Sequence, residues 1–269
     1  MPERADMRAL WILGLIVGPL VLVSIELFHP AGFTTTPGMF EFLRHQEPGG
    51  HGHSALDYFG PDWWFVLHMI QTPTVCLITV ALILTVNAAD TGEIAVRLLA
   101  WGARIALFLF AVYYTALDAI GGIGLGRTLE LVNTLQTETS YTQFGQVVPC
   151  TDGAGVAAPC LSEEQVAGVA LVLNQTWTDK WVGGVGSFIS ETGSWAVFFG
   201  ALLSALTLLV SRGFRRMGIT GMVALAALVG GGWLVQESHA CCTGPTGFGL
   251  IFVFGCLTFA CKGWKSDPS

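Results

Sequence analysis

Charged residues are scarce in this chain of 269 residues. Only 12% are Asp, Glu, Lys or Arg, about half the share found in soluble globular domains. Basic residues are the scarcest, with 12 Lys and Arg against 19 Asp and Glu. This balance argues against a nucleic-acid partner, whose phosphates demand clustered basic charge. Hydrophobic residues make up 52% of the chain and the mean hydropathy is +0.62, so the composition predicts an integral membrane protein and excludes a disordered one.

The sequence also lacks several patterns that would name a function. It has no repeat of the solenoid kind and no inverted repeat typical of transporters. No Cys-x-x-Cys-His segment is present, which excludes c-type haem attachment. No other motif names a reaction, so a functional prediction has to come from where the polar residues lie.

Long apolar runs are present at six places. Crossing a hydrocarbon core of roughly 30 Å takes about 20 residues in a helix, and we expect spans at residues 9–29, 63–86, 98–120, 190–210, 219–236 and 247–261. The first run lacks a small-x-small cleavage site and is expected to remain as an anchor. The predicted fold is an all-α integral membrane protein, a single polytopic domain over 1–269 built as a six-transmembrane helix bundle.

The distribution of Lys and Arg predicts the orientation. With the N-terminus inside, nine of the basic residues fall on the inner side and three on the outer side, as positively charged loops resist translocation. Both termini are therefore expected in the cytoplasm, with the two long loops, 30–62 and 121–189, outside. Short inner loops and compact size indicate a bacterial inner or plasma membrane.

The second outer loop carries local structure of its own. Ser162 and Gln165 have the spacing of a capping box that opens a helix through about Asn174. The stretch 125–139 is expected to form a helix lying on the membrane surface. The outer loops together form the predicted disulfide-bearing cap.

Four of the seven cysteines fall on the predicted outer, oxidising side. Cys150 and Cys160 are ten residues apart in one loop, and we expect a disulfide between them. For the adjacent Cys241 and Cys242, bonding elsewhere, metal ligation and simple burial stay open. Two cysteine pairs on two outer loops resemble the layout of thiol-oxidising membrane proteins that pass electrons to a quinone. Neither pair is the Cys-x-x-Cys that such relays commonly use.

Ionisable residues inside a span are costly to insert and indicate function. The candidates all fall in the outer layer: Glu26, His29, His68, Asp118, Glu191, Glu237 and His239, with Tyr114 one turn from Asp118. Glu26 and His29 have the i, i+3 spacing by which bundle helices offer a carboxylate and an imidazole to one ion. The predicted ligands of a transition metal (Zn, Fe or Cu) are Glu26, His29, His68, Asp118 and His239.

Haem b is the alternative cofactor, with axial ligands drawn from His29, His68 and His239 and space supplied by nearby glycines. In either case Tyr114 is a candidate proton donor and Asp118 a candidate catalytic residue, as in a membrane oxidoreductase or a metal-dependent enzyme. Three further interpretations stay open: a structural hydrogen-bonded network, a non-catalytic accessory subunit of a larger membrane complex, and a proton-coupled transporter. The expected partners are the lipid bilayer and other membrane subunits.

Overall fold

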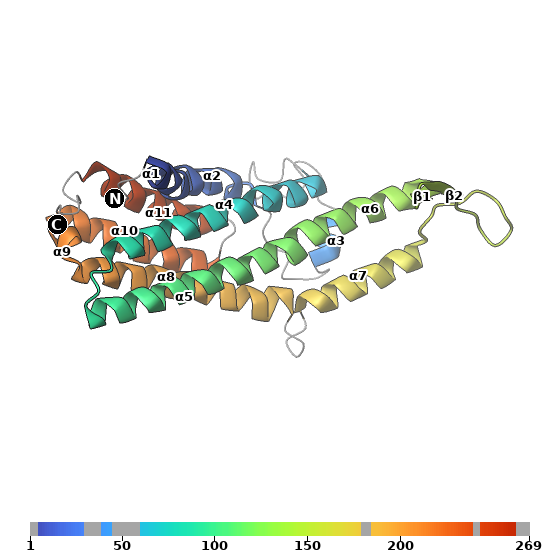
Figure 1. The fold of residues 1–269 in the computed structure, drawn as a ribbon. Helices are drawn as coiled ribbons and strands as arrows, with labels where there is room; N and C mark the ends of the chain where they lie inside the picture. Colours follow the sequence, from blue (N-terminus) through green and yellow to red (C-terminus); the bar gives the residue numbers. More distant parts are fainter. Residues whose placement is uncertain (1–4, 30–38, 45–59, 179–183, 239–242, 262–269) are drawn as a thin grey trace.

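The computed structural model describes residues 5–29, 39–44, 60–178, 184–238 and 243–261, and these residues are mostly helical (Figure 1). Six of their helices are long and apolar enough to cross a membrane, and they correspond one to one to the predicted spans. Their bounds are Arg8–Glu26, Asp62–Ala89, Ile94–Thr137, Val185–Val210, Gly218–Glu237 and Thr243–Ala260. The prediction of an all-α chain with six helices able to span a membrane is thus confirmed.

Three of the six long helices contain a π-helical turn, labelled η. The elements in chain order are α1 (Ala5–Ile12), η1 (Leu13–Val17), α2 (Gly18–Glu26), α3 (Met39–Arg44), α4 (Gly60–Ala89), α5 (Ile94–Leu117), η3 (Asp118–Gly124), α6 (Leu125–Thr137), β1 (Ser140–Gln143), β2 (Gln146–Pro149), α7 (Glu163–Thr178), η4 (Val185–Ile189), α8 (Ser190–Val210), α9 (Arg212–Arg215), α10 (Gly218–Glu237) and α11 (Thr243–Ala260). The first helix ends at Glu26, so His29 lies just beyond its end and not inside the span.

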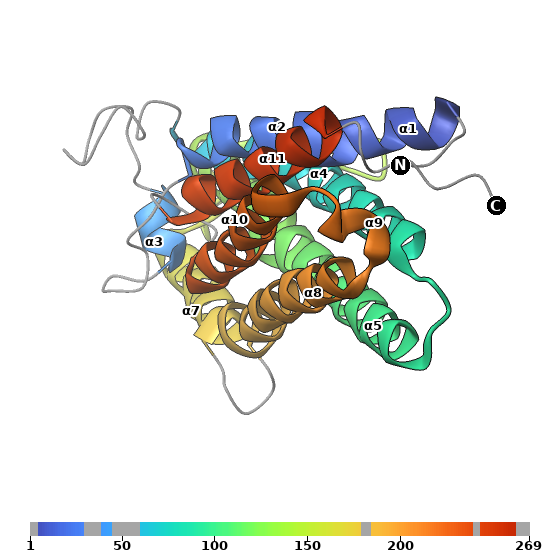
Figure 2. The ribbon, with the colours of Figure 1, turned by 90° about the vertical axis from the view of Figure 1, so that its left-hand side faces the viewer.

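The six helices pack in a closed ring. Going around it, α2 contacts α4, α4 contacts α5, and the order continues through α8, α10 and α11 back to α2 (Figure 2). Glycines bring the helices close together: a Cβ on Gly231 would lie 2.7 Å from the carbonyl oxygen of Gly247, and one on Gly255 would overlap the backbone of Leu15. Close backbone approach of this kind is how helices associate in lipid, where burial of apolar surface gives little advantage.

One face of α5 is exposed and apolar along its whole length, through Leu98, Trp101, Ile105, Phe108 and Val112. These residues are spaced three or four apart and form a continuous stripe on the helix. Such a stripe would be costly in water and is expected of a helix that faces lipid.

A partly buried ion pair joins α4 and α5 at one end of the bundle. The Arg104 guanidinium lies 3.0 Å from the Asp90 carboxylate and donates a second hydrogen bond of 2.7 Å to the Asn87 side chain. Hydrogen bonding to Arg104 holds the pKa of Asp90 below its usual value. The charge of Arg104 is thus held at the end of α4 by Asp90 and Asn87.

The helix predicted to lie on the membrane surface continues the third span instead. Helices α5, η3 and α6 form one helix of 44 residues (Figure 1), about 66 Å long at 1.5 Å per residue. The predicted helix over 125–139 is present as α6, but it is not a separate surface helix. Its apolar stripe Leu125, Leu129 and Val132 packs with Val166 and Ala170 of α7. We call residues 125–178 the helical extension.

The far end of the helical extension is a small braced structure, which we call the tip (residues 138–161). Strands β1 and β2 pair antiparallel, and the predicted disulfide between Cys150 and Cys160 is present. The predicted capping box is also present, since Ser162 and Gln165 exchange hydrogen bonds between side chains and backbone N–H groups at the start of α7.

Candidate functional site

A cluster of buried polar side chains lies where the first helix, α4 and the α5–η3 junction meet. We call it the polar cluster; its members are Glu26, His29, Trp64, His68, Gln71, Thr72, Tyr114 and Asp118. Glu26, Gln71 and Asp118 are completely buried, and His29 and His68 are nearly so. Because residues 64, 68, 71 and 72 are spaced three, four or one apart on α4, one face of that helix carries the middle of the cluster.

Gln71 of α4 links α2 to α5. Its side-chain amide nitrogen donates one hydrogen bond of 2.6 Å to Oε1 of Glu26 and another of 2.6 Å to the hydroxyl of Tyr114. Both hydrogens of the amide are therefore in use. This half of the cluster joins a carboxyl, an amide and a phenol inside an apolar bundle.

Asp118 is held by the neighbouring residue of α4. Its Oδ2 atom lies 3.1 Å from the hydroxyl of Thr72, and the same hydroxyl lies 2.9 Å from the backbone carbonyl oxygen of His68. Among the described residues, neither Asp118 nor Glu26 forms an ion pair with a basic side chain. Three buried side-chain oxygens of the cluster have no hydrogen-bond partner there: Glu26 Oε2, Gln71 Oε1 and Asp118 Oδ1.

Two histidines and a tryptophan form the other half of the polar cluster. The ring centroids of His29 and His68 are 5.5 Å apart, and Trp64 lies 5.1 Å from His29 and 4.6 Å from His68. Nδ1 of His68 is 2.6 Å from the carbonyl oxygen of Trp64. A carbonyl has no hydrogen to give, so Nδ1 carries a proton and donates this hydrogen bond.

The π-helical turn η3 forms one wall of the cluster, and its glycines make the close packing possible. A Cβ on Gly122 would overlap the ring of His68, and one on Gly121 would overlap Trp177. The indole N–H of Trp64 donates a hydrogen bond of 2.8 Å to the Gly121 carbonyl. Glycines near the histidines were expected to leave space for a haem. In the folded chain, Gly122 accommodates the side chain of His68 and Gly121 that of Trp177. π-Helical turns are frequent at functional sites.

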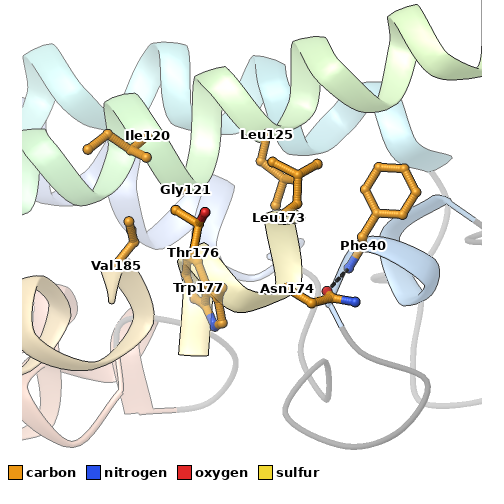
Figure 3. A pocket seen from close by; sticks show the side chains of 9 residues that line it. All are labelled: Phe40, Ile120, Gly121, Leu125, Leu173, Asn174, Thr176, Trp177 and Val185. Carbon is orange, nitrogen blue, oxygen red and sulfur yellow. Dashed lines mark hydrogen bonds between the residues drawn. The ribbon is translucent and has the colours of Figure 1, made fainter. Parts of the chain in front are cut away.

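A mainly apolar hollow of about 320 Å³, counting its open mouth, lies on the other side of the same turn (Figure 3). Ile120, Gly121 and Leu125 line it from the long helix, opposite Trp177 of α7 and Val185 of η4. The backbone of η3 therefore separates the hollow from the polar cluster.

Asn174 and Phe40 close one end of this hollow. The Phe40 N–H donates a hydrogen bond of 3.2 Å to the side-chain oxygen of Asn174, and the Asn174 side-chain nitrogen donates one of 3.0 Å to Glu41. The side chain of Asn174 thus ties α3 to α7.

The structure brings five of the predicted site residues into the polar cluster: Glu26, His29, His68, Tyr114 and Asp118. It does not bring three ligand-type side chains together, since no group of three His, Cys, Asp or Glu within the described ranges could hold a metal ion. Glu191 and Glu237 are exposed and lie elsewhere. His239, Cys241 and Cys242 lie outside the described residues.

Gln71, Thr72 and Trp64 were not predicted as site residues. The signal for Gln71 and Thr72 was a polar pair inside an apolar run, three and four residues after His68. Nothing in the sequence distinguishes Trp64 from the other tryptophans at span boundaries, which an aromatic belt explains.

A comparison of the chain with protein families finds no match, and comparisons with curated proteins and with solved structures find none either. The functional argument therefore depends on the geometry of the polar cluster.

Proposed function

We propose that this chain is a proton-coupled membrane protein in which Glu26 and Asp118 bind and release protons. The observation that carries the proposal is the burial of two carboxyl groups whose hydrogen-bond partners in the described chain are all uncharged. An ionised carboxylate in apolar surroundings costs many kcal/mol unless a cation compensates it, and such a group takes up a proton instead.

The hydrogen bonds of Thr72 support a protonated Asp118. A hydroxyl has one hydrogen, and Thr72 directs it to the carbonyl oxygen of His68, one turn earlier in its own helix, as threonines in helices commonly do. The contact of 3.1 Å between Thr72 Oγ1 and Asp118 Oδ2 then needs a hydrogen from Asp118. A proton on Oδ2 satisfies both contacts, whereas an ionised Asp118 leaves two acceptors competing for one hydrogen.

The pairing of Glu26 with Gln71 supports a proton there as well. Gln71 already donates to Glu26 Oε1, while Glu26 Oε2 and Gln71 Oε1 are buried acceptors without a donor. A carboxylic acid and a primary amide pair through two hydrogen bonds, N–H to the acid carbonyl and O–H to the amide carbonyl. A proton on Glu26 Oε2 would turn this oxygen into a donor suited to Gln71 Oε1, the acceptor of the same amide.

Infrared spectroscopy of the purified protein in nanodiscs tests the proposal. At neutral pH the wild type is expected to show carbonyl absorption of protonated carboxylic acids, part of which disappears in Glu26→Gln and part in Asp118→Asn. Glu191→Gln, which alters an exposed carboxylate, serves as the control and should change nothing in this region. A wild-type spectrum without protonated acid at neutral pH would overturn the proposal.

The coupling itself is tested in vesicles. With the protein reconstituted and a pH gradient imposed, proton movement reported by a trapped pH-sensitive dye is expected to fall in both carboxyl variants and to persist in Glu191→Gln.

The positive-inside assignment and the Cys150–Cys160 disulfide, which forms in oxidising compartments, support a helical extension and a polar cluster on the outer side of a bacterial inner membrane.

The imidazole half of the cluster supports a second candidate function, as a metal-dependent enzyme or oxidoreductase. The rings of His29, just after the first helix, and His68, on α4, lie 5.5 Å apart, and the Trp64 carbonyl orients the His68 ring through Nδ1, as second-shell carbonyls do for metal-bound histidines. Here His29 and His68 would bind Zn, Fe or Cu, with His239 a further predicted ligand and Tyr114 a proton donor.

Metal analysis and an optical spectrum of protein purified without chelator test this candidate. Stoichiometric metal that is lost in His68→Ala but kept in Thr79→Val, a buried control on the same helix, would support it. A Soret band lost in the same variant would identify haem b instead. Protein that is colourless and free of metal would exclude both.

A further inference from the structure

The tip of the helical extension exposes large apolar side chains far from the bundle. Phe144 is 98% exposed, Val147 72% and Val156 61%, and Figure 1 shows the tip at the end of the molecule away from α9. Three large exposed apolar side chains between residues 144 and 156, at the end of a projecting element, indicate an interaction surface.

The bilayer cannot cover these side chains. The helix Ile94–Thr137 is 44 residues long, about 66 Å, while a bilayer core takes up roughly 30 Å of it. The helix continues for 17 residues beyond the expected end of the span at residue 120, which places the tip roughly 25 Å beyond the hydrocarbon region. Phe144, Val147 and Val156 face the aqueous phase, and only another macromolecule can bury them.

The backbone at Phe144 is strained in a way that favours a role for its side chain. Phe144 has a φ of 50° and Gly145 a φ of 80°, the conformation of a two-residue hairpin turn in which Asn-Gly is the favoured pair. A bulky residue in this left-handed region is uncommon and costs about 1 kcal/mol or more. Asn or Gly at 144 would give a more stable hairpin, so the phenyl ring is the feature that the turn presents.

The tip is braced by backbone hydrogen bonds and a disulfide, and its charged residues are all acidic. The Cys160 N–H bonds to the Glu138 carbonyl, and the Cys150 N–H bonds to the Thr139 carbonyl, which fastens the loop to the end of α6. The tip contains two acidic residues, Glu138 and Asp152, and no Lys or Arg, while the whole helical extension contains five acidic residues and one basic residue, Arg127, which pairs with Glu130 near the bundle. A surface that combines a preformed aromatic with acidic charge complements an apolar pocket surrounded by basic residues.

We propose that the tip is a docking surface for a separate protein with a cationic surface, into whose apolar pocket Phe144 inserts. A second copy of this chain through its own tip is disfavoured, because two tips of the same negative charge repel each other. Binding is expected to weaken with salt and to depend strongly on the aromatic ring, as aromatic anchors dominate interface energetics.

Site-specific photocrosslinking in cells is the first test. A photoreactive amino acid at position 144 of the full chain is expected to give a discrete protein adduct. The same amino acid at position 108, an exposed apolar position on α5, is the matched control and should label lipid. Adducts at 144 no stronger than those at 108, or adducts only with a second copy of this chain, would overturn the proposal.

Affinity measurement with the crosslinked protein, purified on its own, is the second test. Phe144→Asn suits the left-handed backbone and keeps the fold, which retention of the Cys150–Cys160 disulfide verifies, yet it should weaken binding at least about tenfold. Phe144→Tyr should bind within about threefold of the wild type, and Glu138→Gln should reduce the dependence on salt. Equal affinity of the wild type and Phe144→Asn contradicts the docking role whatever the outcome for Glu26 and Asp118.

Discussion

The polar cluster and the tip place side chains in environments opposite to those that their chemistry favours. In the cluster, Glu26 and Asp118 are completely buried among apolar helices, whereas at the tip Phe144 is almost completely exposed to water. Each arrangement costs free energy, and each is held by a rigid frame: glycine-mediated packing around η3 in one case, a disulfide-braced hairpin in the other. In both regions, the candidate function lies where side chains depart from their usual burial, and not in the well-packed remainder of the chain.

The largest expected effect comes from filling the space at Gly122. A methyl group there would overlap the ring of His68, which cannot move away because Trp64 and His29 lie against it. Gly122→Ala is expected to destabilise the protein by about 2 kcal/mol or more. Thermal unfolding in detergent measures this, with Gly153→Ala at the tip as the control, since nothing lies within 4 Å of a Cβ there. Equal melting temperatures for the two variants would contradict the close contact between η3 and α4.

A local loss of stability is expected from removing the disulfide. Replacing Cys150 and Cys160 by Ser releases a loop of ten residues and should cost about 2–3 kcal/mol in the stability of the tip. Hydrogen exchange should show faster exchange in residues 138–161 and unchanged protection in α8 and α10. Loss of protection throughout the bundle would show that tip and bundle unfold as one unit.

The smallest expected effect is a gain. Phe144→Gly relieves the left-handed strain and should stabilise the hairpin by about 1 kcal/mol, visible as slower exchange of the amides of β1 and β2. Gly153→Ala is again a suitable control. Faster exchange would mean that the phenyl ring contributes to the stability of the isolated chain.

Hydropathy predicted the spans well because each crosses the membrane as an uninterrupted apolar run, and the cysteine spacing and capping box were correct because they are local. The position of the helix over 125–137 was predicted wrongly because it packs against α7. That helix begins more than 25 residues later in the sequence, and no local sequence pattern indicates that the two pack together. In the cluster, the depth of Glu26, His68 and Asp118 could be predicted from their spans. The connection through Gln71 could not, since it depends on how α2 and α5 rotate toward α4.

The π-helical turn η3 has a further geometric consequence. It interrupts the α-helical repeat between Asp118, which belongs to the polar cluster, and α6, which carries the tip. Each residue of an α-helix advances about 100° around the axis. A gain or loss of one residue in the turn η3 would therefore rotate α6 and the tip about the helix axis by about that angle. The azimuth of Phe144 and the surroundings of Asp118 are therefore set by the same seven residues.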